Sequence, residues 1–445
     1  MLKLYNSLSG KVEEFKPIDK NQVKVYCCGM TVYDKMHLGH AKTYVSCDIL
    51  IKLLRELYKN VIYVRNITDV DDKIINRAKL RNIAIQDLTK EVIEYCQNDL
   101  EYLGNEKPTM EPKATEHIKE IIILIQKLIQ NGYAYKVNGS VFFDVLKYKD
   151  YGKLSNKNIN ELLSGARIEV DEQKHNPLDF VLWKPKSDKD DISSVFDSPW
   201  GKGRPGWHIE CSAMSTKYLS SNFDIHCGGM DLKFPHHENE IAQSKCAFLG
   251  SNYANYWFHT GFLMVNGEKM SKSLGNFITI QDLRDRKING KVLRFLILKN
   301  HYRTPLDFKE TLIEEAKKNL TDLCKITKDI DCEYTVPQEL IDVLCDDLNT
   351  PKAIALLNKY KSEKKLNKLK NSLLFLNIYD EDLTKANKNL DGLDITENEI
   401  NDLIQERKIA KQNKDWATCD KIRDYLKEKR IVLKDNSTNC DWEIC

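Results

Sequence analysis

The sequence contains no apolar run long enough to cross a bilayer. Its most apolar stretch, residues 121–129, is much shorter than the roughly 20 residues of a membrane-spanning helix, and Lys127 interrupts it. The first residues, 1–6, lack the apolar core and small-residue cleavage site of a signal peptide. These two absences predict a cytoplasmic protein with no membrane segment.

The sequence also lacks a disulfide framework, a compact Cys-x-x-Cys knuckle, an internal repeat and a low-complexity tract. Its thirteen cysteines are scattered and odd in number, so reduced thiols that can hold a metal are expected. A net charge of only +2 excludes a chain that is basic throughout, and binding of nucleic acid would need locally concentrated charge. At 445 residues, the chain is expected to form two to four domains.

Residues 23–66 change between strand and helix patterns. Residues 23–27 alternate as a strand does, a turn at residues 29–31 follows, and residues 61–66 form a second strand pattern. Between the two strands, apolar side chains recur at helical spacing: Ala41, Val45, Ile49, Leu53 and Leu57. Strand, turn, helix and strand are typical of the opening of a parallel, nucleotide-binding α/β sheet.

The middle of the chain departs from this pattern. A helix is predicted over residues 118–130, and Asn138-Gly139 supplies the turn of a hairpin over residues 135–142. A hairpin at this point indicates an inserted subdomain, within which residues 187–191 are expected to form a solvated loop. A second hairpin is predicted at Asn266-Gly267.

After residue 308 the pattern is helical until Arg430, with many lysines and glutamates. Residues 406–434 contain ten Lys or Arg and five Asp or Glu, which gives a local net charge of +5 (10 − 5). Such a segment is either a solvated helix face or an RNA-binding surface, and charge alone leaves both open.

Four side chains form a candidate metal site: Cys28, Cys211, His236 and Glu240. On a helix, His236 and Glu240 would point the same way, and Cys28 follows the first strand, where ligands bind in α/β sheets. Thiolate, imidazole and carboxylate together suit zinc. Two buried apolar cysteines with a separate surface His-Glu pair remain an alternative. Rival ligands are also present: Cys27, His237 and Glu238.

Two short motifs indicate nucleotide binding. His37-Leu38-Gly39-His40 lies where the first strand passes into the first helix, where backbone N–H groups and the helix dipole attract phosphate. Residues 269–273, Lys-Met-Ser-Lys-Ser, carry two lysines in a short loop that suits a triphosphate. Either motif alone is weak, but their occurrence in this order is much more specific.

These motifs resemble the signatures of class I aminoacyl-tRNA synthetases. Residues 37–40 are similar to the HIGH signature, with Leu for Ile, and residues 269–273 match KMSKS fully. Longer strings resemble the cysteinyl-tRNA synthetase family: residues 26–34, 203–214, 234–240 and 346–351. The similarity runs from the first residues to about Trp442. Departures are Cys27, Cys227 and the tail around Cys440, where relatives carry other residues.

The resemblance implies an α/β fold with a Rossmann-type parallel-sheet catalytic domain that carries an insertion, then a helical bundle and a small C-terminal domain. The implied segments are as follows: 1–110 and 201–250 for the two halves of the catalytic domain, 111–200 for the insertion, 251–310 for a stem-contact region with the KMSKS loop, 311–395 for a tRNA-binding bundle and 396–445 for an anticodon-side domain.

The resemblance also implies the chemistry. Cysteine would be activated by ATP to cysteinyl-adenylate and then transferred to tRNA(Cys). The implied roles are zinc ligation by Cys28, Cys211, His236 and Glu240; catalysis by His37, His40, Lys269 and Lys272; ATP binding by Gly29, Thr31, His37, Gly39, His40 and Lys272; and amino-acid binding by Thr68, Trp207 and Asp231. One zinc ion per chain, ATP with Mg²⁺ and a monomeric state are expected.

Three other functions stay open on the sequence alone. The first is a related ligase that joins cysteine to an amino-sugar, although such an enzyme should lack the helical, basic region from about 310 to 445. The second is a catalytically silent RNA-binding paralogue, which would be expected to have lost motif residues. The third is a protein whose zinc is purely structural, with no coordination position open to substrate.

Overall fold

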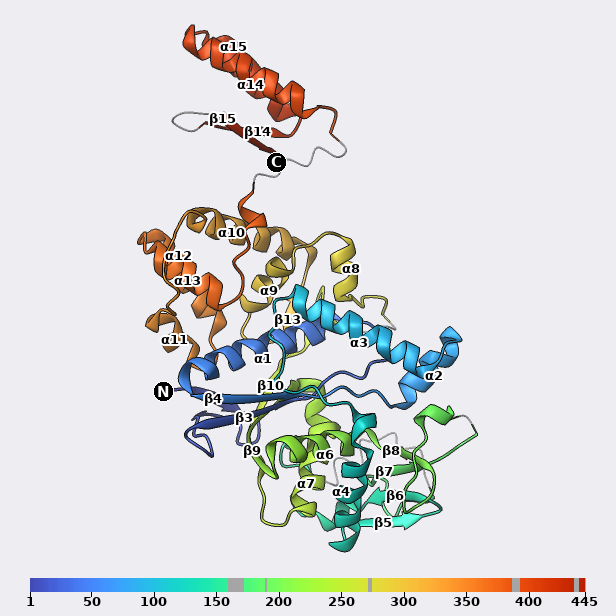
Figure 1. Cartoon of the computed structure of the whole chain (residues 1–445). Coiled ribbons are helices and arrows are strands. Elements are labelled where there is room, and N and C mark those ends of the chain that lie inside the picture. The colour runs from blue at the N-terminus through green and yellow to red at the C-terminus, as the bar shows by residue number, and fades with distance from the viewer. Residues whose placement is uncertain (159–171, 189, 271–273, 386–392, 436–439, 445) are drawn as a thin grey trace. The chain divides into compact units, whose positions relative to one another are not determined.

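The computed structural model describes residues 1–158, 172–188, 190–270, 274–385, 393–435 and 440–444 (Figure 1). The chain forms two compact units, of which the first contains residues 1–320 and 330–379 and the second contains residues 321–329 and 380–445. Within the described ranges, no helix is both long and apolar enough to span a membrane. The cysteines of those ranges form no disulfide.

A four-stranded parallel sheet forms the centre of the first unit, in the order β10–β9–β3–β4. Its strands are β3 (Gln22–Cys27), β4 (Asn60–Arg65), β9 (Asn222–Gly229) and β10 (Tyr253–Thr260). Val25 pairs with Tyr63 on one side and Ile225 on the other, and all three are buried. The sequence-based prediction of a parallel α/β sheet is confirmed.

Helices cover both faces of this sheet, as parallel strands buried on two sides require. α1 (Leu38–Leu57) connects β3 to β4 and packs on one face, whereas α6 (Trp207–Leu219) packs on the other (Figure 1). α7 (Glu238–Ala247) follows β9 and packs against α6. The helix predicted from residues 41–57 is confirmed, and of its recurring apolar residues Ala41, Val45, Ile49 and Leu53 are buried, whereas Leu57 at its end is exposed.

A long excursion separates β4 from β9. It begins with α2 (Asp72–Arg81), α3 (Ile85–Tyr102) and α4 (Ile118–Gln130). A four-stranded antiparallel sheet follows, built from β5 (Ala134–Val137), β6 (Ser140–Phe143), β7 (Phe180–Pro185) and β8 (Gly203–Pro205). Both the predicted helix at 118–130 and the Asn138-Gly139 hairpin are confirmed. Ser187 and Asp188 of the predicted solvated loop are exposed, whereas the Asp190 carboxylate lies 2.6 Å from Arg204 in a largely buried ion pair.

The chain then passes into a smaller sheet in which β11 (Leu263–Val265) pairs with β12 (Glu268–Lys269) and with β13 (Leu306–Phe308). The Asn266-Gly267 turn joins β11 to β12, as predicted. Helices dominate after β13, which confirms the predicted change of pattern. The other α-helices and β-strands of this unit are β1 (Lys3–Asn6), β2 (Lys11–Glu14), α8 (Ile280–Asp285), α9 (Gly290–Leu298), α11 (Gln338–Leu344), α12 (Thr350–Ser362) and α13 (Leu366–Phe375). The helix α10 (Glu310–Thr327) begins in this unit, and its residues from 321 onward belong to the second.

The second unit has a small core of its own. Its helices α14 (Glu397–Gln412) and α15 (Trp416–Glu428) pack together, and β14 (Ile431–Asp435) pairs antiparallel with β15 (Cys440–Ile444). Ile400, Leu426 and Trp442 are among the residues buried between helices and hairpin. Charged side chains therefore stay on the outside of this unit, including most of the basic segment 406–434.

Candidate active site

A cavity of about 320 Å³ opens at the carboxyl ends of the parallel strands, where Cys28, Gly229 and Thr260 follow or end β3, β9 and β10. In open α/β sheets this edge is where ligands bind. Many of the residues predicted from the sequence line it together: Cys28, Gly29, Thr31, His37, Gly39, His40, Trp207, Asp231 and Lys269. The cavity therefore joins both candidate sites.

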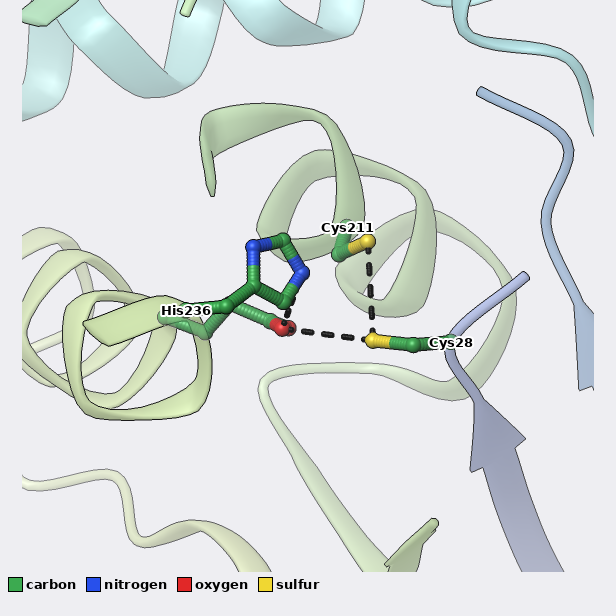
Figure 2. Close-up of side chains that lie close together, drawn as sticks. Cys28, Cys211 and His236 are labelled. Carbon is green, nitrogen blue, oxygen red and sulfur yellow. Dashed lines mark hydrogen bonds and ion pairs between the residues drawn. The ribbon is translucent and has the colours of Figure 1, made fainter. Parts of the chain in front are cut away.

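The four predicted metal ligands meet at one end of this cavity. Their ligand atoms, from Cys28, Cys211, His236 and Glu240, all lie within 4.8 Å of one another and are buried. The Cys28 sulfur is 3.8 Å from that of Cys211 and 3.4 Å from Glu240 Oε1. His236 Nε2 is 3.0 Å from the same Glu240 oxygen. Figure 2 shows Cys28, Cys211 and His236 pointing toward one another from separate segments.

Each ligand is placed by a different element. Cys28 follows β3, and its N–H donates to the Cys227 carbonyl across the sheet. Cys211 lies in the second turn of α6, His236 lies in the turn η5 (Lys233–His237), and Glu240 lies in the first turn of α7. The predicted spacing of four residues between His236 and Glu240 does place both side chains on one side of the chain.

The two thiols differ in their tendency to ionise. The pKa of Cys211 is lowered to about 6, mainly because Cys28 donates a hydrogen bond to its sulfur. Burial raises this pKa, and the neighbouring His236 lowers it further. Burial, and then the neighbouring Cys211, raises the pKa of Cys28 well above its ordinary value. Cys211 is therefore the more readily ionised thiol of the pair, and thiolate is the form that binds metal.

The imidazole and the carboxylate form an ion pair. Burial opposes the charge of His236, but Glu240 and Cys211 outweigh it and raise the pKa of His236 to about 10. Burial likewise opposes the charge of Glu240, but His226 and His236 hold the pKa of Glu240 well below its usual range. Sulfur and carboxylate oxygen atoms thus surround the protonated ring of His236. When a divalent metal replaces that proton, the same atoms and the ring nitrogen are suited to bind it.

Other side chains orient these ligands from behind. His208 Nδ1 lies 2.9 Å from His236 Nδ1, which leaves the Nε2 atom of His236 facing the cluster. His226 Nε2 and the Tyr253 hydroxyl both donate to Glu240 Oε2, at 2.9 and 2.8 Å. The sequence analysis missed His226 and Tyr253. The one available signal was a histidine in the apolar strand that ends at Gly228-Gly229.

Two of the three rival ligands lie away from the ligand group. The Cys27 sulfur lies 3.8 Å from Cys47 of α1, on the opposite face of β3 from Cys28. Glu238 accepts hydrogen bonds from the backbone and hydroxyl of Ser155. His237 remains close, because a second group within the same distance limit contains Cys28, Glu240, His226 and His237. His237 Nδ1 is, however, 2.8 Å from His259 Nε2.

The other end of the cavity carries the first nucleotide motif. His37 caps α1, since His40 N–H donates to His37 Nδ1 at 3.2 Å, and the two imidazole rings stack 3.6 Å apart. Burial, and then His37, lowers the pKa of His40 well below its ordinary value, so this ring is neutral at pH 7. Gly29 lies against β4 so closely that a Cβ would be 1.6 Å from the Asn66 carbonyl oxygen.

The second nucleotide motif begins in β12. Lys269 lines the cavity, and its ammonium lies 4.9 Å from the centre of the Phe262 ring. Lys272 lies outside the described residues. Leu38 at the start of α1 donates its N–H to the Ile278 carbonyl, and Ile280 donates to the Met36 carbonyl. The chain that follows the second motif is thereby joined to the first motif.

The three residues expected to bind the amino acid occupy different depths. Trp207 lines the cavity and stacks on the His236 ring at 4.2 Å. Asp231 also lines the cavity, beside Gly229. Thr68 is buried next to the turn that contains Thr31 and accepts a hydrogen bond from Asn66 at 3.2 Å. It supports the cavity wall from behind.

Comparison with known proteins gives a consistent result. The family described as tRNA synthetases class I (C) catalytic domain matches residues 14–318. A cysteine–tRNA ligase of Wolbachia sp. subsp. Drosophila simulans (strain wRi) is 48% identical over 453 residues, which cover 98% of this chain and 98% of the relative. A cysteine–tRNA ligase of Rickettsia prowazekii (strain Madrid E) is 48% identical over 448 residues, with the same coverage of both chains.

Solved structures share the fold at much lower identity. Methionyl-tRNA synthetase of Mycobacterium tuberculosis, in complex with methionyl-adenylate, has a TM-score of 0.53 at 15% identity and covers 80% of this chain and 82% of its own. LeuRS of Agrobacterium radiobacter K84, in a ternary complex with tRNA and LeuAMS, has a TM-score of 0.55 at 11% identity, covering 82% and 84%. The chain belongs to the cysteine–tRNA ligase family of the class I aminoacyl-tRNA synthetases.

Proposed function

We propose that the protein activates L-cysteine with ATP to cysteinyl-adenylate and transfers the cysteinyl group to tRNA(Cys). Membership of the cysteine–tRNA ligase family supports this reaction, since such a ligase uses ATP, cysteine and tRNA. Similarity over 98% of the chain also argues against the amino-sugar ligase, which should lack the region after about residue 310.

The position of Cys28 is the observation that carries this proposal. Cys28 belongs to the buried ligand group and also lines the cavity that contains both nucleotide motifs. A thiol-containing substrate held at Cys28 would thus lie in the same space as the ATP phosphates near His40 and Lys269. A purely structural metal would more often be held in a local knuckle away from such a cavity.

The donor set of two sulfurs, one imidazole nitrogen and one carboxylate oxygen fits zinc, and its complete burial fits a site that is held ready for a metal. When bound there, zinc would supply a soft Lewis acid that ligates the thiolate of cysteine and discriminates against the hydroxyl of serine. Cavity size alone would separate such close analogues by only about 10–200-fold. The Trp207 ring, stacked on His236, would close the space around the substrate sulfur.

The chain's own residues would perform the activation. His37 and His40 stand at the helix start and can stabilise negative charge on the α-phosphate as the cysteine carboxylate attacks it. Lys269 and Lys272 would hold the β- and γ-phosphates, with Mg²⁺ accompanying ATP. Gly29, Thr31 and Gly39 line the cavity and would contact the nucleotide, and Asp231 and Thr68 would shape the amino-acid end.

Exchange of pyrophosphate into ATP, measured separately with cysteine and serine, tests the proposal. Exchange should depend on cysteine and be negligible with serine. In the Co²⁺-substituted protein, cysteine but not serine should produce a sulfur-to-metal charge-transfer band. A Co²⁺ spectrum that does not respond to cysteine, in a chain that still activates it, would mean that the metal is structural.

We further propose that residues 311–395 and 396–445 contact the tRNA. Lys408, Lys414, Lys421, Lys427 and Arg430 are exposed in the second unit and form no ion pair among the described residues. A chain truncated near residue 310 should still activate cysteine if it folds, but should charge tRNA poorly. The tRNA affinity of the intact chain should fall with salt, and equal charging by both chains would contradict this assignment.

A further inference from the structure

The two oxygens of the Glu240 carboxylate have separate surroundings. Oε1 faces the cluster, 3.4 Å from the Cys28 sulfur and 3.0 Å from His236 Nε2. Oε2 faces the protein and accepts two hydrogen bonds, from Tyr253 and His226. The carboxylate is completely buried, so neither oxygen faces bulk solvent. One oxygen is therefore directed to the metal position and the other is retained by the protein.

Besides its contact with Glu240, Tyr253 is held in place by Ser215 and Phe223. Because a carboxylate only accepts, the Tyr253 hydroxyl gives its hydrogen to Glu240, and the hydroxyl of Ser215, 2.8 Å away, donates to Tyr253 in turn. The ring packs edge-on against Phe223 at 5.0 Å. Tyr253 is fully buried and has no other polar contact to satisfy its hydroxyl within the described residues.

The backbone of Tyr253 provides an independent indication. Its φ angle is +67°, a left-handed conformation that bulky side chains rarely adopt. Such conformations cost free energy and are maintained where the surrounding structure or the function requires them. Here the strained residue is the first of β10, and its side chain reaches the Glu240 carboxylate.

His226 makes the second contact. Its Nε2–H donates to Oε2, and its buried Nδ1 has no hydrogen-bond partner among the residues that the structure describes. The imidazole stacks on Trp257 with ring centres 4.5 Å apart, and this stacking fixes its plane. Oε2 thus has two donors in fixed positions, each a charge-assisted hydrogen bond.

We propose that Tyr253, together with His226, is a positioning residue that makes Glu240 a ligand through one oxygen only. With Oε2 retained by the protein, Glu240 cannot turn to offer both oxygens to the metal, and a coordination position stays available to the cysteine thiolate. This inference rests on the proposed function, because it assigns these two residues a role toward the metal that Cys28, Cys211, His236 and Glu240 would hold.

Tyr253→Phe tests this directly, because it removes the donor with little change of shape. The variant should still bind one metal ion per chain. Its Co²⁺ absorption should change before any substrate is added, since the freed Oε2 can join the metal and raise the coordination number. Cysteine, titrated through its charge-transfer band, should bind about 10-fold more weakly or worse, as expected for loss of a charge-assisted hydrogen bond.

Tyr256→Phe is the matched control on the same strand. Its hydroxyl donates to the Glu14 carbonyl and accepts from Lys16 N–H, away from the cluster, so Co²⁺ absorption and cysteine affinity should not change. If Tyr253→Phe does not fold, His226→Leu removes the other donor and should give the same spectral change.

A folded Tyr253→Phe with an unchanged Co²⁺ spectrum and unchanged cysteine affinity would overturn the inference. Loss of the metal together with a lower melting temperature would also overturn it, because that result means a structural role only. If the unmodified chain itself binds no Co²⁺, the proposed metal fails first, and that failure is separately visible.

Discussion

The two ends of the active-site cavity are built in opposite ways. At the metal end, every candidate ligand is buried and comes from its own segment, and His236 and Glu240 are oriented by further contacts with His208, His226 and Tyr253. At the nucleotide end, Lys269 is exposed and belongs to a two-residue strand. The metal end of the cavity is therefore closely packed, whereas the nucleotide end is open to solvent at Lys269.

This difference follows from what each end would bind. Distinguishing a sulfur from an oxygen requires ligand atoms fixed to within fractions of an ångström, which only close packing and satisfied hydrogen bonds provide. A triphosphate carries several charges, and cations on a loop can hold it through contacts that form as it binds. Substitutions at the two ends should therefore fail in different ways.

The largest effect is expected at the metal end. Cys211→Ser would remove one of the two sulfur atoms of the proposed metal site, so metal content and cysteine activation should fall together, activation by at least about 1,000-fold. Metal analysis and pyrophosphate exchange measure the two losses. Cys246→Ser replaces another buried cysteine, outside the ligand group, and should retain both. Retention of metal by Cys211→Ser would mean that Cys211 is not a ligand, and the two ends of the cavity would then not differ in the way described.

The nucleotide end should fail without losing metal. Lys272→Ala would remove the proposed phosphate contact and should slow adenylate formation by about 100–1,000-fold. Binding of free cysteine, followed by the Co²⁺ band, should barely change. Lys149→Ala, an exposed lysine of the insertion, serves as a control. An undiminished exchange rate in Lys272→Ala would mean that this lysine does not hold the phosphates of ATP.

A smaller effect is expected in the chain that leads to the second nucleotide motif, residues 269–273. Buried Lys42 of α1 donates to the Gly261 and Thr304 carbonyls, at 2.8 and 2.6 Å, and so ties the chain leading into β11 to the first nucleotide helix. Lys42→Met should lower the exchange rate about 10-fold through kcat, with metal content unchanged, because carbonyls left without donors would let this segment shift. Lys42→Arg should restore part of the rate. Equal losses of metal and rate would mean general unfolding instead.

The smallest effect concerns a buried charge with no ligand role. Burial, opposed by Arg284 of α8, raises the pKa of Asp99 to about 6. The unfolded carboxyl ionises near its ordinary pKa, so stability is lost as pH rises from about 4 to 6, and the penalty persists above that range. Asp99→Asn should therefore stabilise the protein by about 1 kcal/mol at pH 7 and by almost nothing at pH 4. Denaturant titration at both pH values measures this, and equal effects at both would refute it.

Much of the fold could be predicted from local patterns. The spacing of apolar residues over 41–57 predicted α1, and the alternation at 23–27 predicted β3. Both predictions succeed because the buried side of a helix or strand determines how far apart its apolar residues lie in the sequence. The Asn-Gly pairs gave both hairpins, since their backbone conformation is needed for tight turns. The burial of the Asp190 carboxylate was not predicted, because Asp190 lies in a loop and its partner Arg204 lies on β8, fourteen residues further along the chain.

The candidate site divides along the same line. The sequence by itself determined the ligand types, the two nucleotide motifs and the family they resemble, because those depend on which side chains occur and in which order. Only the tertiary structure decided that Cys28 rather than Cys27 faces Cys211, since two neighbours in a strand point to opposite faces. It alone also placed His226 and Tyr253 on the far oxygen of Glu240, because contacts between residues distant in sequence follow from packing and leave no local pattern.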